Sequence, residues 1–265
     1  MKIAYFDCFS GASGDMIIGA LLDSGLDLEA LKNELSKLNL SHYQLDVEPV
    51  IKGAIGGSKA LIAVDQEHHG HYHRKLSDIK EIIEGSEIDD AIKTKSIAIF
   101  TRLAEAEAKV HRTTIEDIHF HEVGAMDTII DVVGAVSGLS LLGVENIYCS
   151  AFNVGSGMVQ CAHGLLPVPA PATAELISGA PAYATEGTGE LLTPTGAAIL
   201  TTQAVGFGPM PPMRIEAIGY GAGSLETKIP NLLRVTVGEA LDRESTTGHH
   251  HHHHHHSVPE GHSES

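Results

Sequence analysis

Tryptophan is absent from this chain of 265 residues, and aromatic side chains make up only 5% of it. The sequence therefore offers no evident aromatic platform on which bases or sugars could stack. Basic side chains are also few, with 17 Lys and Arg against 34 Asp and Glu, which gives a formal net charge of -17. Because so acidic a surface repels a polyanion such as DNA, we expect no nucleic-acid partner.

Cysteine and long apolar runs are scarce as well. Cys8, Cys149 and Cys161 form a sparse and odd set of thiols, which argues against a disulfide framework and favours a reducing compartment. The apolar stretch at the start of the sequence is short and ends at Asp7, so it has the features of neither a signal peptide nor a membrane span. We therefore predict a soluble, cytoplasmic protein without a membrane partner.

Hydrophobic residues make up 43% of the chain, a globular composition, and their spacing changes along it. Residues 27–38, 89–109 and 125–142 have the period of helices, whereas residues 43–64 alternate in the manner of a β-hairpin. Further helices are predicted at 16–22, from Ser77, at 172–177 and after Pro194, and strands at 3–9, 147–149, 215–223 and 232–238. Since strands mingle with helices throughout, we predict a mixed α/β (α+β) fold of sheets with packed helices.

The folded part is expected to span residues 1–241, and its division into two subdomains is left open. After Leu241 the composition shifts abruptly and leads to eight consecutive histidines, His249–His256. Residues 242–265 are therefore predicted to be a disordered His-rich linker or tail. Because the sequence continues beyond the histidines, we interpret them as a native tract that stores metal ions, with a purification tag as the alternative.

Histidine is the residue in surplus, with 18 His against 17 Lys and Arg combined. Four histidines outside the tail stand close together in a segment without an apolar period: His68, His69, His71 and His73. Neutral imidazole favours zinc, copper and nickel over hard ions such as magnesium. This segment is therefore either a loop that binds a later transition metal or a solvated polar loop.

A second group of ionisable residues stands in the sequence HFHEVGAMDTIID, which begins at His119 and ends at Asp131. In an extended segment His119 and His121 share one face, and Asp127 and Asp131 lie one turn apart on the following helix. Two imidazoles with the Glu122 carboxylate could form an open metal site, or one histidine could be a general base oriented by Glu122. The alternative is a surface loop that leads to an acidic helix start.

Two further motifs place glycine and hydroxyl groups before a predicted helix. The first is DCFSGASGDM, residues 7–16, and the second is GTGELLTPTGA, residues 187–197. Backbone N–H groups in such loops bind phosphate or carboxylate groups, and the carboxylates of Asp7 and Asp15 also suit a cation. A capped helix explains both motifs without any ligand. The pair Cys161 and His163 is weaker evidence for a nickel or zinc site, since buried cysteine is more often a small apolar residue.

Together, the motifs at 7–16, 119–131 and 187–197 resemble the LarC family, the nickel-insertion proteins of nickel-pincer cofactor biosynthesis, and the match runs from residue 1 to about 240. The resemblance implies a CTP-dependent cyclometallase, a lyase that inserts nickel into pyridinium-3,5-bisthiocarboxylic acid mononucleotide. The product, with two nickel–sulfur bonds and one nickel–carbon bond, serves lactate racemase. Family members are usually longer and carry a C-terminal domain associated with CTP, so the resemblance implies that this chain is the N-terminal part.

The resemblance also suggests a role for each motif. Nickel would be held by His119, His121 and Glu122 and collected by His68, His69, His71 and His73, with His121, Glu122 and Asp127 acting in catalysis. The substrate would be bound by Asp7, Ser10, Gly11, Ser13, Gly14 and Asp15 and by Gly187, Thr188, Gly189, Thr193, Thr195 and Gly196. CTP with Mg2+ or Mn2+ is expected on the C-terminal part. Expected partners are the mononucleotide, that C-terminal half and the lactate racemase apoprotein, with homo-oligomer formation left open.

Two other functions fit the same residues. A nickel storage or delivery protein without chemistry of its own would bind nickel mainly through His249–His256 and leave the absorption spectrum of the substrate unchanged. A metal-dependent hydrolase would use the group from His119 to Glu122 and would need only an added divalent metal.

Overall fold

The computed structural model of the chain describes residues 1–65, 74–120, 126–161 and 163–241. A seven-stranded mixed sheet has the order β11-β4-β1-β13-β12-β3-β2. Its strands are β1 (Lys2–Asp7), β2 (Tyr43–Lys52), β3 (Ile55–Val64), β4 (Asn146–Cys149), β11 (Ala204–Phe207), β12 (Met213–Ala222) and β13 (Leu232–Ala240). β4 runs parallel to β1 and β11, and β12 parallel to β3, whereas β13 is antiparallel to both of its neighbours and β2 to β3.

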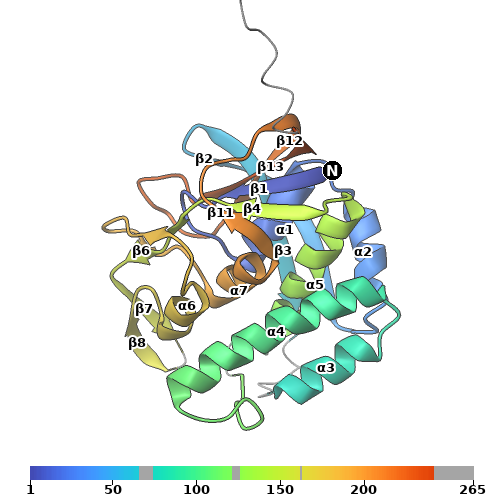
Figure 1. Cartoon of the computed structure of the whole chain (residues 1–265), viewed down its shortest axis with the longest axis vertical. Coiled ribbons are helices and arrows are strands. Elements are labelled where there is room, and N and C mark those ends of the chain that lie inside the picture. Colours follow the sequence, from blue (N-terminus) through green and yellow to red (C-terminus); the bar gives the residue numbers. More distant parts are fainter. Residues whose placement is uncertain (66–73, 121–125, 162, 242–265) are drawn as a thin grey trace, which may run out of the picture.

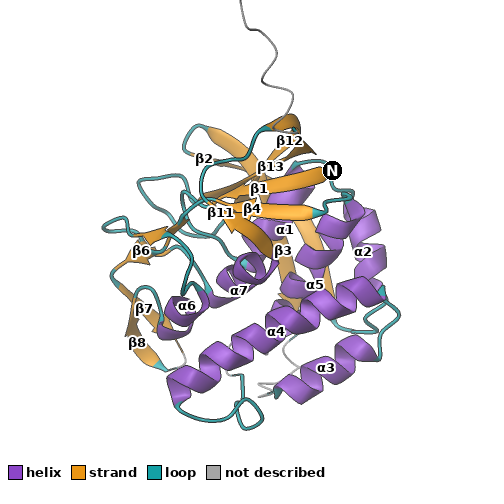
Figure 2. Ribbon diagram, in the orientation of Figure 1, coloured by secondary structure: helices purple, strands orange, loops and turns teal. Residues whose placement is uncertain are grey.

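The helices lie to one side of this sheet in successive layers (Figures 1 and 2). α1 (Gly14–Asp23) packs directly on β12 and β3, and α5 (Met126–Leu141) packs on α1. α4 (Asp90–His111) crosses α5, α6 (Pro171–Leu176) and α7 (Pro194–Gln203), while α2 (Leu28–Ser36) packs on α5 and α3 (Leu76–Glu84) on α4. The predicted mixed fold of a sheet with packed helices is thus confirmed.

Glycine on β12 allows α1 to approach the sheet closely. A Cβ atom at Gly221 would lie 1.8 Å from the carbonyl oxygen of Met16, and one at Gly219 would lie 2.1 Å from that of Ala20. A side chain at either position would therefore push the helix away from the strand. This contact fixes the position of α1 and hence of the loop that precedes it.

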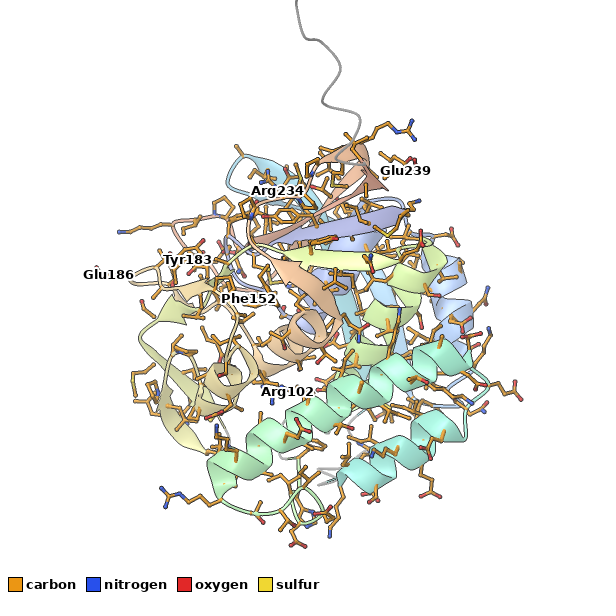
Figure 3. The ribbon with its side chains drawn as sticks, viewed as in Figure 1. Arg102, Phe152, Tyr183, Glu186, Arg234 and Glu239 are labelled. Atoms are coloured by element: carbon orange, nitrogen blue, oxygen red, sulfur yellow. The ribbon has the colours of Figure 1, made fainter. Side chains whose placement is uncertain are left out.

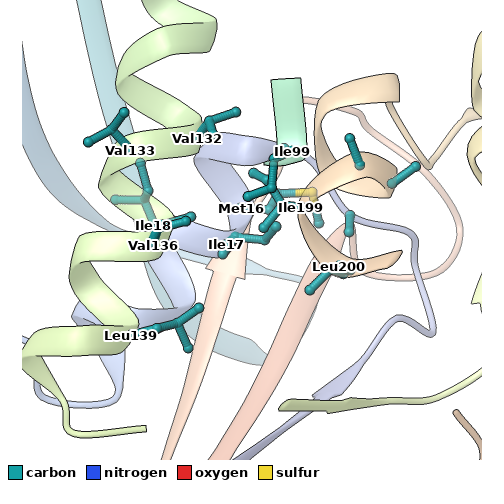
Figure 4. Close-up of a cluster of buried hydrophobic side chains, with 14 of the residues drawn as sticks. Met16, Ile17, Ile18, Ile99, Val132, Val133, Val136, Leu139, Ile199 and Leu200 are labelled. Carbon is teal, nitrogen blue, oxygen red and sulfur yellow. The ribbon is translucent and has the colours of Figure 1, made fainter. Parts of the chain in front are cut away.

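The hydrophobic core surrounds α1 (Figure 4). Ile17 and Ile18 have no exposed surface, and neither have Ile99 of α4 and Ile199 of α7. Each such buried side chain stabilises the fold by roughly 1.5–3 kcal/mol relative to exposure. The neighbours from α5 and α7 that Figure 4 labels are Val132, Val133, Val136, Leu139 and Leu200.

Residues 152–190 contain short strands that the sequence pattern did not predict. β5 (Phe152–Asn153) pairs with β9 (Ala182–Tyr183), β6 (Gly155–Ser156) with β10 (Gly189–Glu190), and β7 (Met158–Cys161) with β8 (Gly164–Pro167). Strands of two to four residues are too short to show an alternating period among glycines and prolines. The strands β6, β7 and β8 lie on the α6 side of the helical layer (Figure 1).

The longer predicted elements are present, several with the expected end signals. The Asp27 carboxylate caps α2 by accepting a hydrogen bond from the Ala30 N–H at 2.7 Å, and Pro194 is the first residue of α7. None of the described helices is both long and apolar enough to cross a membrane. The predicted tail, residues 242–265, lies outside the described residues, and the domain boundary at 241 stays a prediction.

Candidate functional site

The first glycine-rich motif forms a tight loop between β1 and α1. Gly11 has φ +78°, and its N–H donates a hydrogen bond to the Cys8 carbonyl at 3.0 Å. A Cβ atom at this position would lie 1.9 Å from the carbonyl oxygen of Leu191. Only glycine therefore satisfies both the turn and the close approach of a second chain segment.

That second segment brings the start of α7 against the loop. The Ala12 N–H donates to the Leu191 carbonyl at 3.1 Å, and the Thr193 N–H donates to the Ala12 carbonyl at 3.0 Å. A Cβ atom at Gly196 would lie 2.3 Å from the Ala12 carbonyl oxygen. Two predicted binding motifs, 10–15 and 193–196, therefore meet in space, although they are far apart in sequence.

The amino-terminal end of α5 meets the same loop. A Cβ atom at Gly14 would lie 2.3 Å from Cγ of Asp131, so the start of α1 packs directly on this carboxyl group. The Asp15 carboxylate accepts hydrogen bonds from the Ser13 hydroxyl and, at 2.9 Å, from the Met16 N–H. Asp127, in the first turn of α5, accepts the Thr128 N–H at 2.8 Å.

Asp15, Asp127 and Asp131 form what we call the carboxylate cluster. Burial raises the pKa of Asp131 well above its usual range, and the negative charges of Asp15 and Asp127 raise it further. Oδ1 of Asp131 is buried and makes no hydrogen bond to any described residue. A carboxyl group whose pKa is raised holds a proton more tightly than an exposed carboxylate does, which suits it to acid–base chemistry. The remaining negative charge of the cluster comes from Asp15 and Asp127.

Acidic side chains are distributed unequally among the amino-terminal ends of α1, α5 and α7. Asp15 and Asp127 stand in the first turns of α1 and α5, whereas α7 has no acidic residue in its first turn. Instead, the Thr193 hydroxyl caps α7 by accepting the Gly196 N–H at 3.2 Å. The end of α7 is therefore the one suited to an anion, whereas acidic side chains already offset the dipoles of α1 and α5.

The predicted nickel ligands are only partly within the described chain. His119 is exposed between buried Ile118 and Phe120, as expected of an extended segment. His121 and Glu122, with His68, His69, His71 and His73, lie outside the described residues. Across the ranges that are described, no three His, Cys, Asp or Glu side chains are arranged to hold a metal ion.

A backbone bridge links the described residues that adjoin the two histidine segments. Phe120 pairs with Arg74 in an antiparallel bridge, and the Phe120 N–H donates to the Arg74 carbonyl at 3.0 Å. In sequence, Arg74 directly follows His73, and Phe120 stands between His119 and His121. The described residues that adjoin the two histidine segments, Arg74 and Phe120, are therefore hydrogen-bonded neighbours.

Within the described chain, the turn from Gly187 to Gly189 forms its hydrogen bonds with Ser156 and Thr185 and not with the glycine-rich loop before α1. The Gly187 N–H donates to Ser156 Oγ at 3.0 Å, and the Thr188 hydroxyl donates to the Thr185 carbonyl at 2.8 Å. Gly189 pairs with Ser156 in the short β6–β10 sheet. This half of the second motif therefore belongs to the short strands, and it reaches the glycine-rich loop only through the following residues.

The contacts of Asp7 and Ser10 are with the protein's own fold. The Asp7 carboxylate forms an ion pair with Arg234 of β13, which Figure 3 labels. Ser10 is fully buried, and its hydroxyl makes no hydrogen bond to a described group. Their assignment to substrate binding stays a prediction, as does that of Thr195, which is 8% exposed at the start of α7.

Two asparagines that support the loop were not identified from the sequence. Asn153 Nδ2 donates to the Phe9 carbonyl at 2.8 Å, and Asn231 Nδ2 donates to the Ser10 carbonyl at 3.3 Å. The two amides, one from β5 and one from the residue before β13, thus hold adjacent carbonyls of the loop. Asn153 begins the glycine-rich sequence NVGSG, which was a usable signal, whereas Asn231 stands in no recognisable motif.

Comparison with known proteins agrees with these motifs. The model of a family described as nickel insertion protein matches residues 4–259. The pyridinium-3,5-bisthiocarboxylic acid mononucleotide nickel insertion protein of Desulfitobacterium hafniense (strain DSM 10664 / DCB-2) is 54% identical over 244 residues, which cover 92% of this chain and 60% of that protein. The protein of the same name from Acetivibrio thermocellus is 48% identical over 252 residues, 92% of this chain and 62% of its own length.

The chain thus spans about 60% of the length of these curated relatives. No solved structure matches it. A match over nearly all of the sequence, together with identities near one half, leads to a plain conclusion: the chain belongs to the family of nickel insertion proteins.

Proposed function

We propose that this chain takes part in inserting nickel into pyridinium-3,5-bisthiocarboxylic acid mononucleotide. The observation that carries the proposal is the 54% identity over 92% of the chain to a relative named for that reaction. Because the chain spans 60% of that relative, we assign it the amino-terminal part of the machinery. CTP with Mg2+ or Mn2+ is assigned to the remaining, carboxyl-terminal part.

The division of charge at the site supports this substrate. A mononucleotide carries a phosphate, which suits the Thr193 cap and the N–H groups at the start of α7. The pyridinium ring and the nickel ion are positive, and both suit the neighbouring carboxylate cluster. In this arrangement the phosphate would face the start of α7, and the pyridinium ring would face the carboxylate cluster.

The chemistry requires a held nickel ion and a proton acceptor. The substrate supplies two sulfur ligands, so imidazoles at His119 and His121 with Glu122 would hold the ion only until transfer. As the nickel–carbon bond forms, the ring C–H bond breaks and its proton passes to a carboxylate, while nickel remains divalent. We assign this proton to Asp127 or to the ionised form of Asp131, because burial favours the protonated state of that carboxyl.

Nickel supply and product use complete the proposal. The bridge between Arg74 and Phe120 supports a common nickel ion for His68–His73 and His119–Glu122. We propose that His249–His256 also collects nickel. The reaction would be that of a cytoplasmic lyase, and its product would be delivered to a lactate racemase apoprotein.

The test mixes the purified chain with nickel, CTP and the mononucleotide, with and without a separately supplied carboxyl-terminal part. Product is detected by the change in the substrate's absorption and by the mass of the nickel adduct. We expect product only when both parts are present, and none with the double variant His119→Ala, His121→Ala. The variant His42→Asn, which changes a histidine outside the motifs, serves as the matched control. Full insertion by the double variant would overturn the ligand assignment.

The storage alternative is not favoured by the names of the relatives, which describe insertion into a defined precursor. It predicts nickel binding dominated by His249–His256 and no spectral change of the substrate in the same experiment. The hydrolase alternative predicts phosphatase or amidase activity with an added divalent metal in the absence of CTP. Either result would replace the proposed function.

A further inference from the structure

A pocket of about 250 Å³ lies between the end of α4 and the β7–β8 hairpin. Its lining includes four side chains that are metal ligands in other proteins, namely Glu107, His111, Cys161 and His163. Of these four, the sequence pattern indicates only Cys161 and His163 as ligands, and neither residue enters the proposed reaction. We call this region the thiol–imidazole pocket.

The four donors come from two separate elements. Glu107 and His111 stand one turn apart on α4, with 3.4 Å between Oε2 and Nε2. The rings of His111 and His163 approach to 4.8 Å between centroids, at an angle of 45° between their planes. The Cys161 thiol donates to the Gly164 carbonyl at 3.4 Å, so the hairpin turn itself positions the sulfur. The fold therefore gathers two imidazoles, a carboxylate and a thiol around one pocket.

The electrostatics of the pocket favour a cation. Glu190 joins Glu107 in the wall, and the described lining contains neither lysine nor arginine. His111 is the last residue of α4, where the helix dipole presents its negative end. A thiolate and two imidazoles select a later transition ion over magnesium or calcium.

We propose that Glu107, His111, Cys161 and His163 form a second nickel(II) site, from which the metal is loaded toward the substrate. On binding, the Cys161 thiol releases its proton to solvent as the nickel–sulfur bond forms, and nickel remains divalent. No three donors among the described residues are already in ligand geometry, so their side chains must turn toward the ion.

The position of the pocket next to the start of α7 supports a role in loading nickel. Pro194, the first residue of α7, forms part of the pocket wall. The adjacent residue, Thr193, donates its N–H to Ala12 in the glycine-rich loop at 3.0 Å. The pocket therefore borders the helix end that we assign to the substrate phosphate. The loading role rests on the proposed function, whereas nickel binding itself does not.

Thiolate-to-nickel charge-transfer absorption tests the site in the full chain. Cys8 and Cys149 are both fully buried, and histidine tracts give no such band, so the signal reports on Cys161. We expect a band when Ni2+ is added, its loss in Cys161→Ser, and affinity lowered about tenfold or more in His111→Ala and His163→Ala. His42→Asn is the matched histidine control and should leave the band unchanged. A band that persists in Cys161→Ser, or is absent from the unmodified chain, overturns the proposal.

Alkylation gives a second measurement that does not depend on absorption. Iodoacetamide modification of Cys161, followed by mass spectrometry, should slow at least several-fold when Ni2+ is added. Equal rates with and without nickel overturn the site.

Insertion assays separate this site from the proposed function. If Cys161→Ser inserts nickel slowly at limiting Ni2+ and normally in excess, the loading role is supported. If it inserts normally at limiting Ni2+, that role is overturned. If the unmodified chain with its carboxyl-terminal part shows the band but forms no product, the nickel site stands and the proposed function fails.

Discussion

The carboxylate cluster and the thiol–imidazole pocket hold their polar groups in opposite ways. In the cluster, the Gly14 backbone packs on Asp131, and Gly11 and Gly196 bring further backbone against the loop. In the pocket, His163 is exposed on a hairpin turn and His111 stands at the end of a helix. The carboxylate cluster is thus fixed in place by backbone contacts. The ligands of the thiol–imidazole pocket instead stand on a helix end and a hairpin turn.

This difference corresponds to two chemical needs. A group that accepts a proton in a reaction must be held in place, because misplacement by about 1 Å costs about a hundredfold in rate. A site that receives and gives up a metal ion needs access and ligands that can move. The two regions therefore differ in construction in the way their proposed roles require. Substitutions in the cluster should change stability and insertion, whereas substitutions in the pocket should change nickel binding.

Gly14→Ala should have the largest effect on stability. Its Cβ atom would lie 2.3 Å from Cγ and 2.5 Å from Cβ of Asp131, and that Cβ atom cannot move without shifting α5. We expect a loss of about 3 kcal/mol in the free energy of unfolding, measured by urea denaturation. Gly56→Ala is the matched control, since a Cβ there meets nothing within 4 Å. Equal stability of the two variants would show that the cluster is not fixed by this contact.

Asp131→Asn should lower nickel insertion while raising stability at high pH. Burial raises the folded-state pKa of Asp131, so the folded protein favours the protonated form, and stability falls as pH rises through that pKa. The amide cannot ionise, so the variant should be the more stable protein at pH 8, and its advantage should vanish toward pH 4. Thermal unfolding across this range measures the effect.

Insertion by Asp131→Asn should fall about a hundredfold if Asp131 accepts the proton. Asp46→Asn is the control, because Asp46 is an exposed carboxylate paired with Lys32 at 3.3 Å. Unchanged insertion with the expected stability gain would leave Asp127 as the proton acceptor. A pH-independent stability difference would contradict the burial argument itself.

Thr193→Ala should have a smaller effect, confined to α7. It removes the hydroxyl that accepts the Gly196 N–H at 3.2 Å, and loss of such a cap costs about 1 kcal/mol. It should also weaken substrate binding, measured by titration of the mononucleotide. Thr201→Ala is the control on the same helix, since its hydroxyl only donates to the Ala197 carbonyl at 2.7 Å. Equal binding by both variants would remove the end of α7 from the substrate site.

The sequence predicted the long elements because their apolar periods are unbroken. It missed β5 to β11, strands of only two to four residues, because so short a run shows little period among glycines and prolines. It could not predict that residues 12 and 193 are hydrogen-bonded, because that contact depends on the whole fold. Asp127 and Asp131 were recognised by spacing, but the burial of Asp131 against Gly14 arises only when α1 and α5 pack. Asn231 gave no signal, since one amide that holds a loop carbonyl has no sequence pattern.

Cys161→Ser should have the smallest effect on the metal-free protein. Cys161 lies on the β7–β8 hairpin and is only partly buried, so we expect a change within about 0.5 kcal/mol in the free energy of unfolding. Buried Cys149→Ser makes the same chemical change within the core and should cost more.

Adding nickel should then separate the two proteins. A ligand that binds only the folded state stabilises it by about 2.7 kcal/mol at a hundredfold excess over Kd, whereas nickel bound equally by folded and unfolded chains adds nothing. The unmodified chain should therefore gain thermal stability from Ni2+, and Cys161→Ser should lose the part of that gain that the thiol–imidazole pocket contributes, even though it keeps every histidine. An equal gain in both proteins would show that the thiol is not a ligand. The thiol–imidazole pocket would then no longer serve as the open metal site in this comparison.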